Sequence, residues 1–220
     1  MALKLYGIAA SRTSRPLWVL EELGVPYERV KIDYRAGGSR TPAMLALNPN
    51  GHLPVLEDDE IIVWESMACA LYLARKYTSE LAQSDGLPCL GALNLAEEAE
   101  LLRWTFWTVT EVEKDALIVL EHRLVMPENR RDPSYAEKAE KRLMVPLRVL
   151  EAHLANRSYV AGERFTVADI NVASVVTWIR PAAQMMARFP KVSAWLKLCL
   201  DRPAQMRVRE MARSDTRIAL

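Results

Sequence analysis

Cysteine and histidine are scarce in this 220-residue sequence, which has three of each. The cysteines are Cys69, Cys89 and Cys199, and the histidines are His52, His122 and His153. An odd number of widely spaced cysteines gives no disulfide framework, and the dispersed histidines offer no metal-ligand spacing. We therefore predict neither disulfide bonds nor a bound metal ion.

Long apolar runs and an excess of one charge are also missing. No apolar stretch reaches the roughly 18 residues that a membrane-spanning helix needs. Lys4 is not followed by the apolar core of a signal peptide. Lys and Arg total 29 against 28 for Asp and Glu, a formal net charge of +1. We therefore expect no nucleic acid and no membrane as a partner, and a protein that stays in the cytoplasm.

The composition that remains is the ordinary balance of a globular protein, with 50% hydrophobic and 26% charged residues. A chain of 220 residues has room for one large domain or two smaller ones. The sequence shows no internal repeat and no low-complexity tract.

The first third of the chain alternates between strand and helix patterns. Residues 3–6 and 30–34 alternate apolar with polar side chains, and between them three leucines form one helical stripe that Gly24 ends. Such a strand–helix–strand unit predicts parallel strands. A short helix over residues 41–47, a hairpin and a helix from Ser66 follow. The resulting order βαβαββα is that of a thioredoxin-like domain.

The hairpin is the most informative part of this domain. Two short apolar runs on either side of an acidic turn contain Leu53, Val55, Ile61 and Val63. Pro54 cannot donate to a sheet ladder, so it marks an edge or a special turn, one form of which is a cis Leu53–Pro54 peptide. We expect this turn to leave the N–H and C=O of Val55 unpaired, beside a helix start at Ser66 that favours an anion. The corner suits a peptide-like ligand with a carboxylate.

Beyond this domain the strand patterns end. Residues 79–92 have the serine, glycine and proline content of a linker, and residues 93–220 show only helical patterns. The first helix runs to about Val125, and its helical spacing is marked by an apolar stripe made of Leu95, Ala99, Leu102, Phe106 and Val109. Thr166 and Asp169 have the spacing of a helix capping box.

Two stretches resemble cytosolic glutathione S-transferases, and among them the serine-type members of bacteria. The first is Asn48-Pro49-Asn50-Gly51-His52-Leu53-Pro54-Val55-Leu56-Glu57-Asp58 with the later Glu65-Ser66, and the second is Phe165 to Asn171. The resemblance implies an α/β plus all-α fold. Its N-terminal thioredoxin-like domain (1–78) binds glutathione, and after the linker (79–92) an all-helical domain (93–220) carries the electrophile pocket.

Ser11 is the candidate catalytic residue. It follows the first strand near the start of the first helix, where backbone N–H groups stabilise an adjacent anion. Ser11-Arg12-Thr13-Ser14 has C-x-x-C spacing with hydroxyls in place of both sulfurs, which excludes thiol–disulfide exchange at this site. The resemblance implies that Ser11 hydrogen-bonds the thiolate of bound glutathione. Ser14, Thr13 and Tyr6 remain alternatives, and capping of the helix is the other role open to Ser11 or Ser14.

The resemblance also implies the other site residues. The expected glutathione-binding residues are His52, Leu53, Pro54, Val55, Glu65 and Ser66. In the family the glutamate meets the γ-glutamyl ammonium group and the serine holds its α-carboxylate. His52 stands where the family often has a Lys or Gln for the glycyl carboxylate, and a solvated loop histidine is the alternative.

Two further groups of residues are assigned more loosely. Trp107, Thr108 and Glu111 lie on another side of the long helix from its stripe and are candidates for the apolar electrophile pocket. Arg12 and Arg15 are candidates for anchoring the ligand or for a salt bridge between subunits, with solvated surface as the alternative.

The implied function is glutathione S-transfer to a small apolar electrophile, with glutathione as co-substrate and no metal. A glutathione-dependent isomerase, dehalogenase or peroxidase on the same fold is one alternative, and a non-catalytic glutathione-binding module is another. The resemblance also implies a symmetric homodimer. We expect the small, methionine-bearing face formed by residues 67–70 of the third helix to be available for contact with the partner subunit.

Overall fold

The structure is a computed structural model that describes residues 3–34, 36–81 and 89–218. Within these residues the chain divides into two compact units, of which the second is Leu93–Asp201 and the first is the remainder. The first unit therefore combines the N-terminal part of the chain with its last helix.

The first unit contains a four-stranded sheet with the spatial order β2-β1-β3-β4. Its strands are β1 (Lys4–Tyr6), β2 (Glu28–Val30), β3 (Val55–Asp58) and β4 (Ile61–Trp64). β1 is parallel to β2, as the strand–helix–strand unit predicts, and antiparallel to β3, which forms a hairpin with β4. Leu5 and Leu56 are paired in register and fully buried, so they lie on the core side of the sheet.

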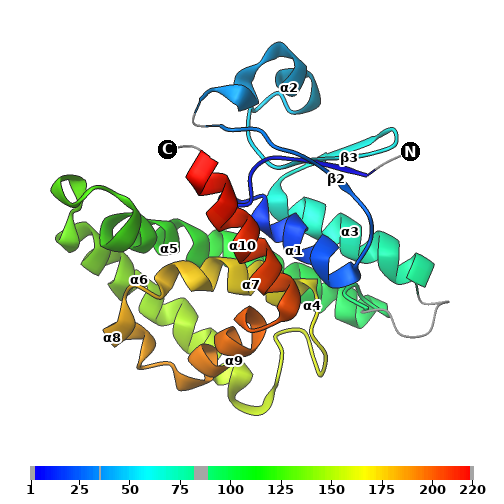
Figure 1. Cartoon of the computed structure of the whole chain (residues 1–220). Coiled ribbons are helices and arrows are strands. Elements are labelled where there is room, and N and C mark those ends of the chain that lie inside the picture. The colour runs from blue at the N-terminus through cyan, green and yellow to red at the C-terminus, as the bar shows by residue number, and fades with distance from the viewer. Residues whose placement is uncertain (1–2, 35, 82–88, 219–220) are drawn as a thin grey trace. The chain divides into compact units, whose positions relative to one another are not determined.

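Helices cover this sheet. In the described part of the unit they are α1 (Ser14–Leu23), α2 (Pro42–Leu47), α3 (Ser66–Leu81) and α10 (Pro203–Ile218), with a 3-10 turn at Gly38–Arg40. α1 and α3 pack against each other on one side of the sheet, and α2 lies on the other (Figure 1). Gly24 ends α1 with a left-handed φ of 65°, as the sequence predicts. The fold of this unit is the predicted thioredoxin-like one.

The last helix does not belong to the helical unit, although we expected residues 93–220 to form one domain. α10 packs against α1 of the first unit. Arg202 donates to both carboxylate oxygens of Glu22 (2.6 and 2.7 Å), and Arg207 donates to the carbonyl of Glu21 (2.7 Å). The amphipathic pattern of a helix predicts a buried side but not the element that covers it, which is why the sequence did not reveal this position.

The second unit is all-helical, as expected. Its described helices are α4 (Leu95–Trp107), α5 (Glu113–Leu120), α6 (Pro133–His153), α7 (Val167–Val176), α8 (Ala183–Met186) and α9 (Pro190–Leu200). π-helical turns at Thr108–Val112 and Glu121–Val125 continue α4 and α5 into one long helical stretch. The remaining 3-10 turns are Glu128–Arg130, Leu154–Asn156 and Thr177–Ile179.

α7 is the centre of this unit, because every one of its residues is buried. Its start has the predicted capping box, in which the N–H of Thr166 donates to Asp169 (2.9 Å). Asp169 also accepts hydrogen bonds from the N–H of Val160 and from Nε1 of Trp195, both at 2.9 Å. The cap therefore joins three segments of the unit as well as starting the helix.

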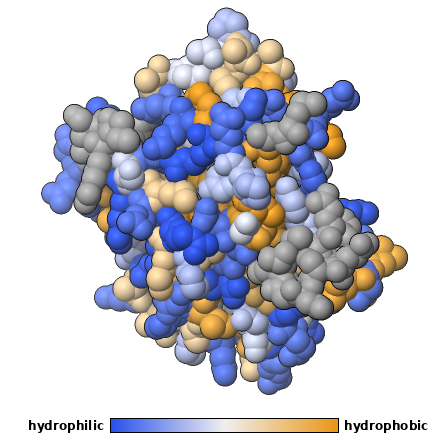
Figure 2. Space-filling model, turned by 45° about the vertical axis from the view of Figure 1, so that its right-hand side comes forward, coloured by the Kyte–Doolittle hydropathy of each residue, from blue (hydrophilic) through white to orange (hydrophobic). Residues whose placement is uncertain are grey.

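The apolar stripe that predicts the long helix is on its exposed side. Leu95 is 81% exposed and Phe106 63%, and Leu102 and Val109 are exposed as well. The buried side consists of Leu101, Trp104, Thr105, Thr108 and Val112. The helix has apolar residues on both sides, so residue spacing predicts a helix but does not decide which side is buried. Figure 2 shows that apolar residues are also scattered among the polar surface on the face that it presents.

The methionine-bearing face of α3 also differs from the expectation. Met67, Cys69 and Ala70 are buried, and α3 packs against α1 and β4. Ala68 is the exposed member of this segment. Residues 67–70 therefore offer little surface to a partner.

In the described part of the chain, no helix combines the length and the apolar character that crossing a bilayer requires.

Candidate functional site

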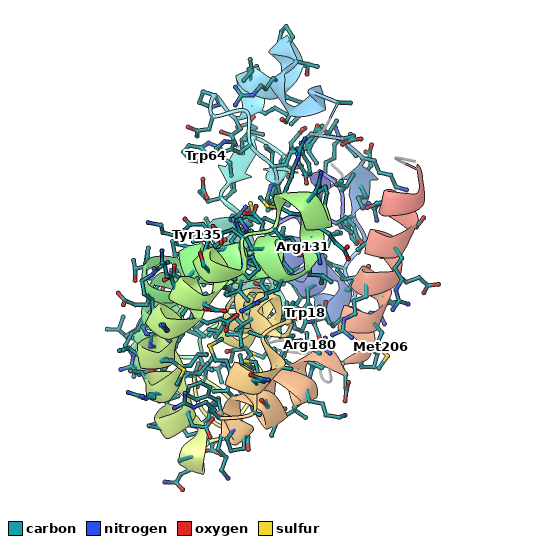
Figure 3. All side chains as sticks on the ribbon, turned by 90° about the vertical axis from the view of Figure 1, so that its left-hand side faces the viewer. Trp18, Trp64, Arg131, Tyr135, Arg180 and Met206 are labelled. Carbon is teal, nitrogen blue, oxygen red and sulfur yellow. The ribbon has the colours of Figure 1, made fainter. Side chains whose placement is uncertain are left out.

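The ends of three strands bring the predicted site residues of the first unit to one edge of the sheet. Tyr6 ends β1 and is in register with Val55, which begins β3. Val55 is in register with Trp64, which ends β4 and is labelled in Figure 3. The loop after Tyr6, the Leu53–Pro54 peptide and the Glu65–Ser66 pair therefore leave the sheet at this edge, which we call the Tyr6–Trp64 edge.

The turn that leads into β3 is held by a buried asparagine. The side chain of Asn48 donates to the carbonyl of His52 (3.0 Å) and accepts from the N–H of Asn50 (3.1 Å). The Leu53–Pro54 peptide bond that follows is cis. His52 is exposed, so its ring can reach solvent or a ligand.

The backbone available at this turn belongs to Leu53 and not to Val55. Val55 is fully buried in the ladder between β1 and β4, so the expectation that its N–H and C=O lie unpaired outside the sheet is wrong. Leu53 precedes the strand and is half-buried. Its N–H and C=O have no hydrogen-bond partner among the residues that the structure describes. Free backbone groups beside a strand can pair with an extended peptide.

The start of α3 has an uncommon backbone conformation. Glu65 has a φ of 71°, in the left-handed region that non-glycine residues rarely adopt, and its side chain is exposed. Its carbonyl accepts the N–H of Cys69 (2.9 Å), so Glu65 is the residue that caps the helix. Conformations of this kind gather at functional sites. The first N–H groups of α3, starting at Ser66, favour an anion.

A buried arginine stands behind Ser66. Nη1 of Arg15 donates to Oγ of Ser66 over 2.9 Å, and Arg15 is only 2% exposed. Because the guanidinium occupies a lone pair of Ser66 Oγ, the hydroxyl proton is available for donation to another group. A buried cation at a helix N-terminus adds to its attraction for an anion. The solvated-surface interpretation of Arg15 is therefore wrong.

The loop between β1 and α1 holds Ser11 in a compact network. Oγ of Ser11 lies 2.7 Å from the carbonyl oxygen of Ile8 and 2.9 Å from Oγ1 of Thr13, and it accepts the N–H of Thr13 (3.2 Å). Thr13 packs against Gly7 so closely that a Cβ on Gly7 would lie 2.2 Å from Oγ1 of Thr13. This contact fixes the loop and leaves Ser11 partly exposed in front of Thr13.

The three alternative hydroxyls differ in their surroundings. Thr13 is fully buried, so it supports Ser11 and does not reach the surface. Ser14, the first residue of α1, is half-buried. Tyr6 donates to Oε2 of Glu57 (2.6 Å), and burial together with this hydrogen bond raises the pKa of Tyr6 to about 12. Its hydroxyl is therefore a protonated donor committed to Glu57.

The pocket candidates of the second unit are not equivalent. Thr108 is fully buried and its hydroxyl donates to the carbonyl of Trp104 (2.8 Å), so it cannot line an open pocket as expected. Trp107 is half-buried and packs edge-on against Trp104, with 5.0 Å between ring centroids. Glu111 is exposed. Trp107 and Glu111 therefore remain the surface candidates.

Sequence reasoning missed one contact to the Ser11 loop. Asp215 of α10 accepts the N–H of Ala9 over 2.7 Å, although the two residues are 206 positions apart. No local pattern links residues at this separation, so only the fold reveals the contact. Among the described residues, no cluster of three or more His, Cys, Asp or Glu side chains is arranged to hold a metal ion.

Comparison with known proteins identifies the family to which this arrangement belongs. The family model "Glutathione S-transferase, N-terminal domain" matches residues 1–75, and "Glutathione S-transferase, C-terminal domain" matches residues 114–203. Glutathione S-transferase 3 of Zea mays is 36% identical over 208 residues, which cover 92% of this chain and 90% of that protein.

Solved structures give the same result. Glutathione transferase F7 from Populus trichocarpa has a TM-score of 0.85 and 30% identity, covering 96% of this chain and 99% of its own. Maize glutathione S-transferase I, solved in complex with an atrazine glutathione conjugate, has a TM-score of 0.81 and 29% identity, covering 97% and 99%. The chain belongs to the glutathione S-transferase family.

Proposed function

We propose that this protein is a serine-type glutathione S-transferase of the bacterial kind, which activates the glutathione thiol for attack on a small apolar electrophile. Family membership and the conjugate bound to the maize relative support a conjugation reaction. The main support for the proposal is the Tyr6–Trp64 edge. One peptide-sized ligand finds hydrogen-bond partners there for its backbone, its carboxylate and its thiol.

Glutathione binding uses backbone and charge together. The free N–H and C=O of Leu53 pair with the cysteinyl part of glutathione, and Pro54 and Val55 hold Leu53 in place at the sheet. Ser66 donates its N–H and hydroxyl to the γ-glutamyl α-carboxylate, and Arg15 fixes that hydroxyl. Glu65 meets the ammonium group, and exposed His52 meets the glycyl carboxylate.

Ser11 acts on the thiol. The hydroxyl of Ser11 turns its proton from the carbonyl of Ile8 to the sulfur of bound glutathione, while the N–H of Thr13 keeps Oγ in place. A hydrogen bond to the thiolate favours the charged form and lowers the thiol pKa from its ordinary ~8.5. The thiolate then attacks the electrophile, and the new carbon–sulfur bond forms as the leaving group departs or as the electrophile accepts the electron pair.

The second unit supplies the electrophile pocket, with Trp107 and Glu111 as its candidate residues. The protein is a homodimer, and the exposed apolar stripe of α4 supports this, since Leu95 and Phe106 are among its most exposed apolar residues. It works in the cytoplasm in a detoxifying role. A thiol co-substrate requires a reducing compartment, and Cys69, Cys89 and Cys199 form no disulfide with one another.

One experiment separates this function from its alternatives. Calorimetry with glutathione is followed by turnover measurements on a panel of electrophiles, with product analysis by mass spectrometry. We expect wild type to bind glutathione and to form conjugates, and Ser11→Ala to bind glutathione but to lose turnover. Absence of binding would contradict the proposal. Binding without any turnover indicates a non-catalytic module, and products that lack glutathione indicate an isomerase, dehalogenase or peroxidase.

A further inference from the structure

Asp215 brings a buried carboxylate from α10 to the loop that carries Ser11. Its side chain is 1% exposed, and its Oδ2 accepts the N–H of Ala9 over 2.7 Å. The other oxygen, Oδ1, pairs with Nη2 of Arg29 and lies 3.4 Å from Nζ of Lys31. Three donors thus hold this carboxylate in a single position. They are the N–H of Ala9 in the loop after β1, the side chain of Arg29 in β2, and the side chain of Lys31 just after β2.

The contact to Ala9 reaches Ser11 through one peptide group. The N–H of Ala9 and the C=O of Ile8 are the two polar ends of the same planar unit. Asp215 holds the N–H end, and Oγ of Ser11 lies 2.7 Å from the oxygen at the other end. Fixing one end of a planar peptide fixes the direction of the other.

The other contacts of α10 do not reach this loop. Arg202 and Arg207 bind Glu22 and Glu21 in the last turn of α1, at the opposite end of that helix from its start at Ser14. These contacts anchor the helix, whereas Asp215 anchors the loop. The chain therefore contains a natural control for any effect of Asp215.

We propose that Asp215 is a positioning residue for Ser11, acting through the Ile8–Ala9 peptide to keep the Ser11 hydroxyl where it meets the glutathione thiol. This inference rests on the proposed function, and it adds α10 to the parts of the fold that set the reactivity of the thiol. Without Asp215 the Ile8–Ala9 peptide and the backbone that leads from it to Ser11 are held less firmly, so Oγ of Ser11 is spread over several positions and stabilises the thiolate less.

The test measures the pKa of the bound thiol and the turnover at neutral pH in wild type and in a set of variants. Asp215→Ala removes the contact to Ala9. Arg207→Gln loosens the same helix without touching the loop, and Arg29→Gln breaks the buried ion pair but keeps the carboxylate on Ala9. Ser11→Ala is combined with Asp215→Ala to complete a double-mutant cycle. Where Asp215→Ala does not fold, Arg29→Met with Asp215→Leu removes the contact without stranding a buried charge.

We expect Asp215→Ala to raise the thiol pKa and to lower turnover between about 10- and 100-fold, the cost of a small misplacement of a reacting group. Arg207→Gln and Arg29→Gln keep the wild-type pKa, and glutathione affinity stays unchanged in all of them. Asp215→Asn, whose amide oxygen can still accept the N–H of Ala9, recovers most of the loss. In the Ser11→Ala background, Asp215→Ala has no further effect.

Two results overturn the inference. One is a wild-type pKa in Asp215→Ala, and the other is a loss that persists in the Ser11→Ala background, which indicates a general structural role. Failure of the proposed function looks different, because Ser11→Ala alone then leaves both the thiol pKa and turnover unchanged.

Discussion

Replacing Arg15 by methionine tests how the carboxylate end of glutathione is held. Methionine keeps an unbranched apolar stem but removes the guanidinium that donates to Oγ of Ser66 over 2.9 Å. Arg15 is 2% exposed, so this bond is not weakened by competition with water. A hydrogen bond to a charged group contributes ~1.5–3 kcal/mol. If that energy orients the Ser66 hydroxyl toward the carboxylate, its loss weakens glutathione binding roughly 10- to 100-fold.

The assay is titration calorimetry of Arg15→Met with glutathione and with an analogue whose γ-glutamyl α-carboxylate is an amide. Arg12→Met is the matched control, because it makes the same chemical change at an exposed position three residues earlier, in the loop before α1. We expect Arg15→Met to weaken glutathione much more than the analogue, and Arg12→Met to weaken neither strongly. Equal losses for both ligands, or no loss at all in a variant that remains folded by urea titration, would refute the reasoning.

Three other changes test separate parts of the structure. Glu65→Gly relieves the left-handed conformation, so we expect ~1 kcal/mol more stability in urea titration together with weaker glutathione binding; unchanged affinity would remove Glu65 from the site. Burial works against ionisation of Asp58, but the hydrogen bonds from Lys76 and Tyr72 outweigh it and lower the pKa of Asp58. Its contribution to stability is therefore present above the unfolded pKa near ~4 and is lost as the pH falls through the lower folded value. Asp58→Asn should cost ~1–3 kcal/mol at pH 7 and much less at pH 3, and a pH-independent difference would contradict this. Phe106→Glu, in the exposed stripe of α4, should convert the proposed dimer to particles of one chain in light scattering, whereas an unchanged mass would exclude that surface.

The parts of the fold that depend on local signals were predictable from the sequence. Gly24 ends α1, Thr166 and Asp169 start α7, and the hairpin around its acidic turn has the expected pairing. Each of these features is set by residues within a few positions of one another, so the chemistry of the stretch determines its structure. The Glu65–Ser66 pair at the start of α3 is of the same kind.

The features that sequence reasoning missed depend on distant contacts or on register. A shift of two residues separates the buried Val55 from the available backbone of Leu53, and only the pairing of β3 with both neighbours decides between them. The long helix has apolar residues on two sides, so its pattern predicts a helix but not the side that faces the core. Asp215 lies 206 residues from Ala9, and the folded chain alone brings them together.

The central claim is that Ser11 lowers the pKa of bound glutathione. The most direct measurement is the thiolate absorbance of the glutathione complex, titrated from about pH 5 to pH 10 in wild type and in Ser11→Ala. We expect the wild-type complex to titrate about two units below the ordinary ~8.5 of a thiol, which corresponds to ~2.7 kcal/mol, and the variant to titrate close to 8.5 with nearly unchanged glutathione affinity. Superimposable titration curves would contradict the account, and a shift appearing in Ser14→Ala or Thr13→Ala instead would assign the thiol to a different hydroxyl.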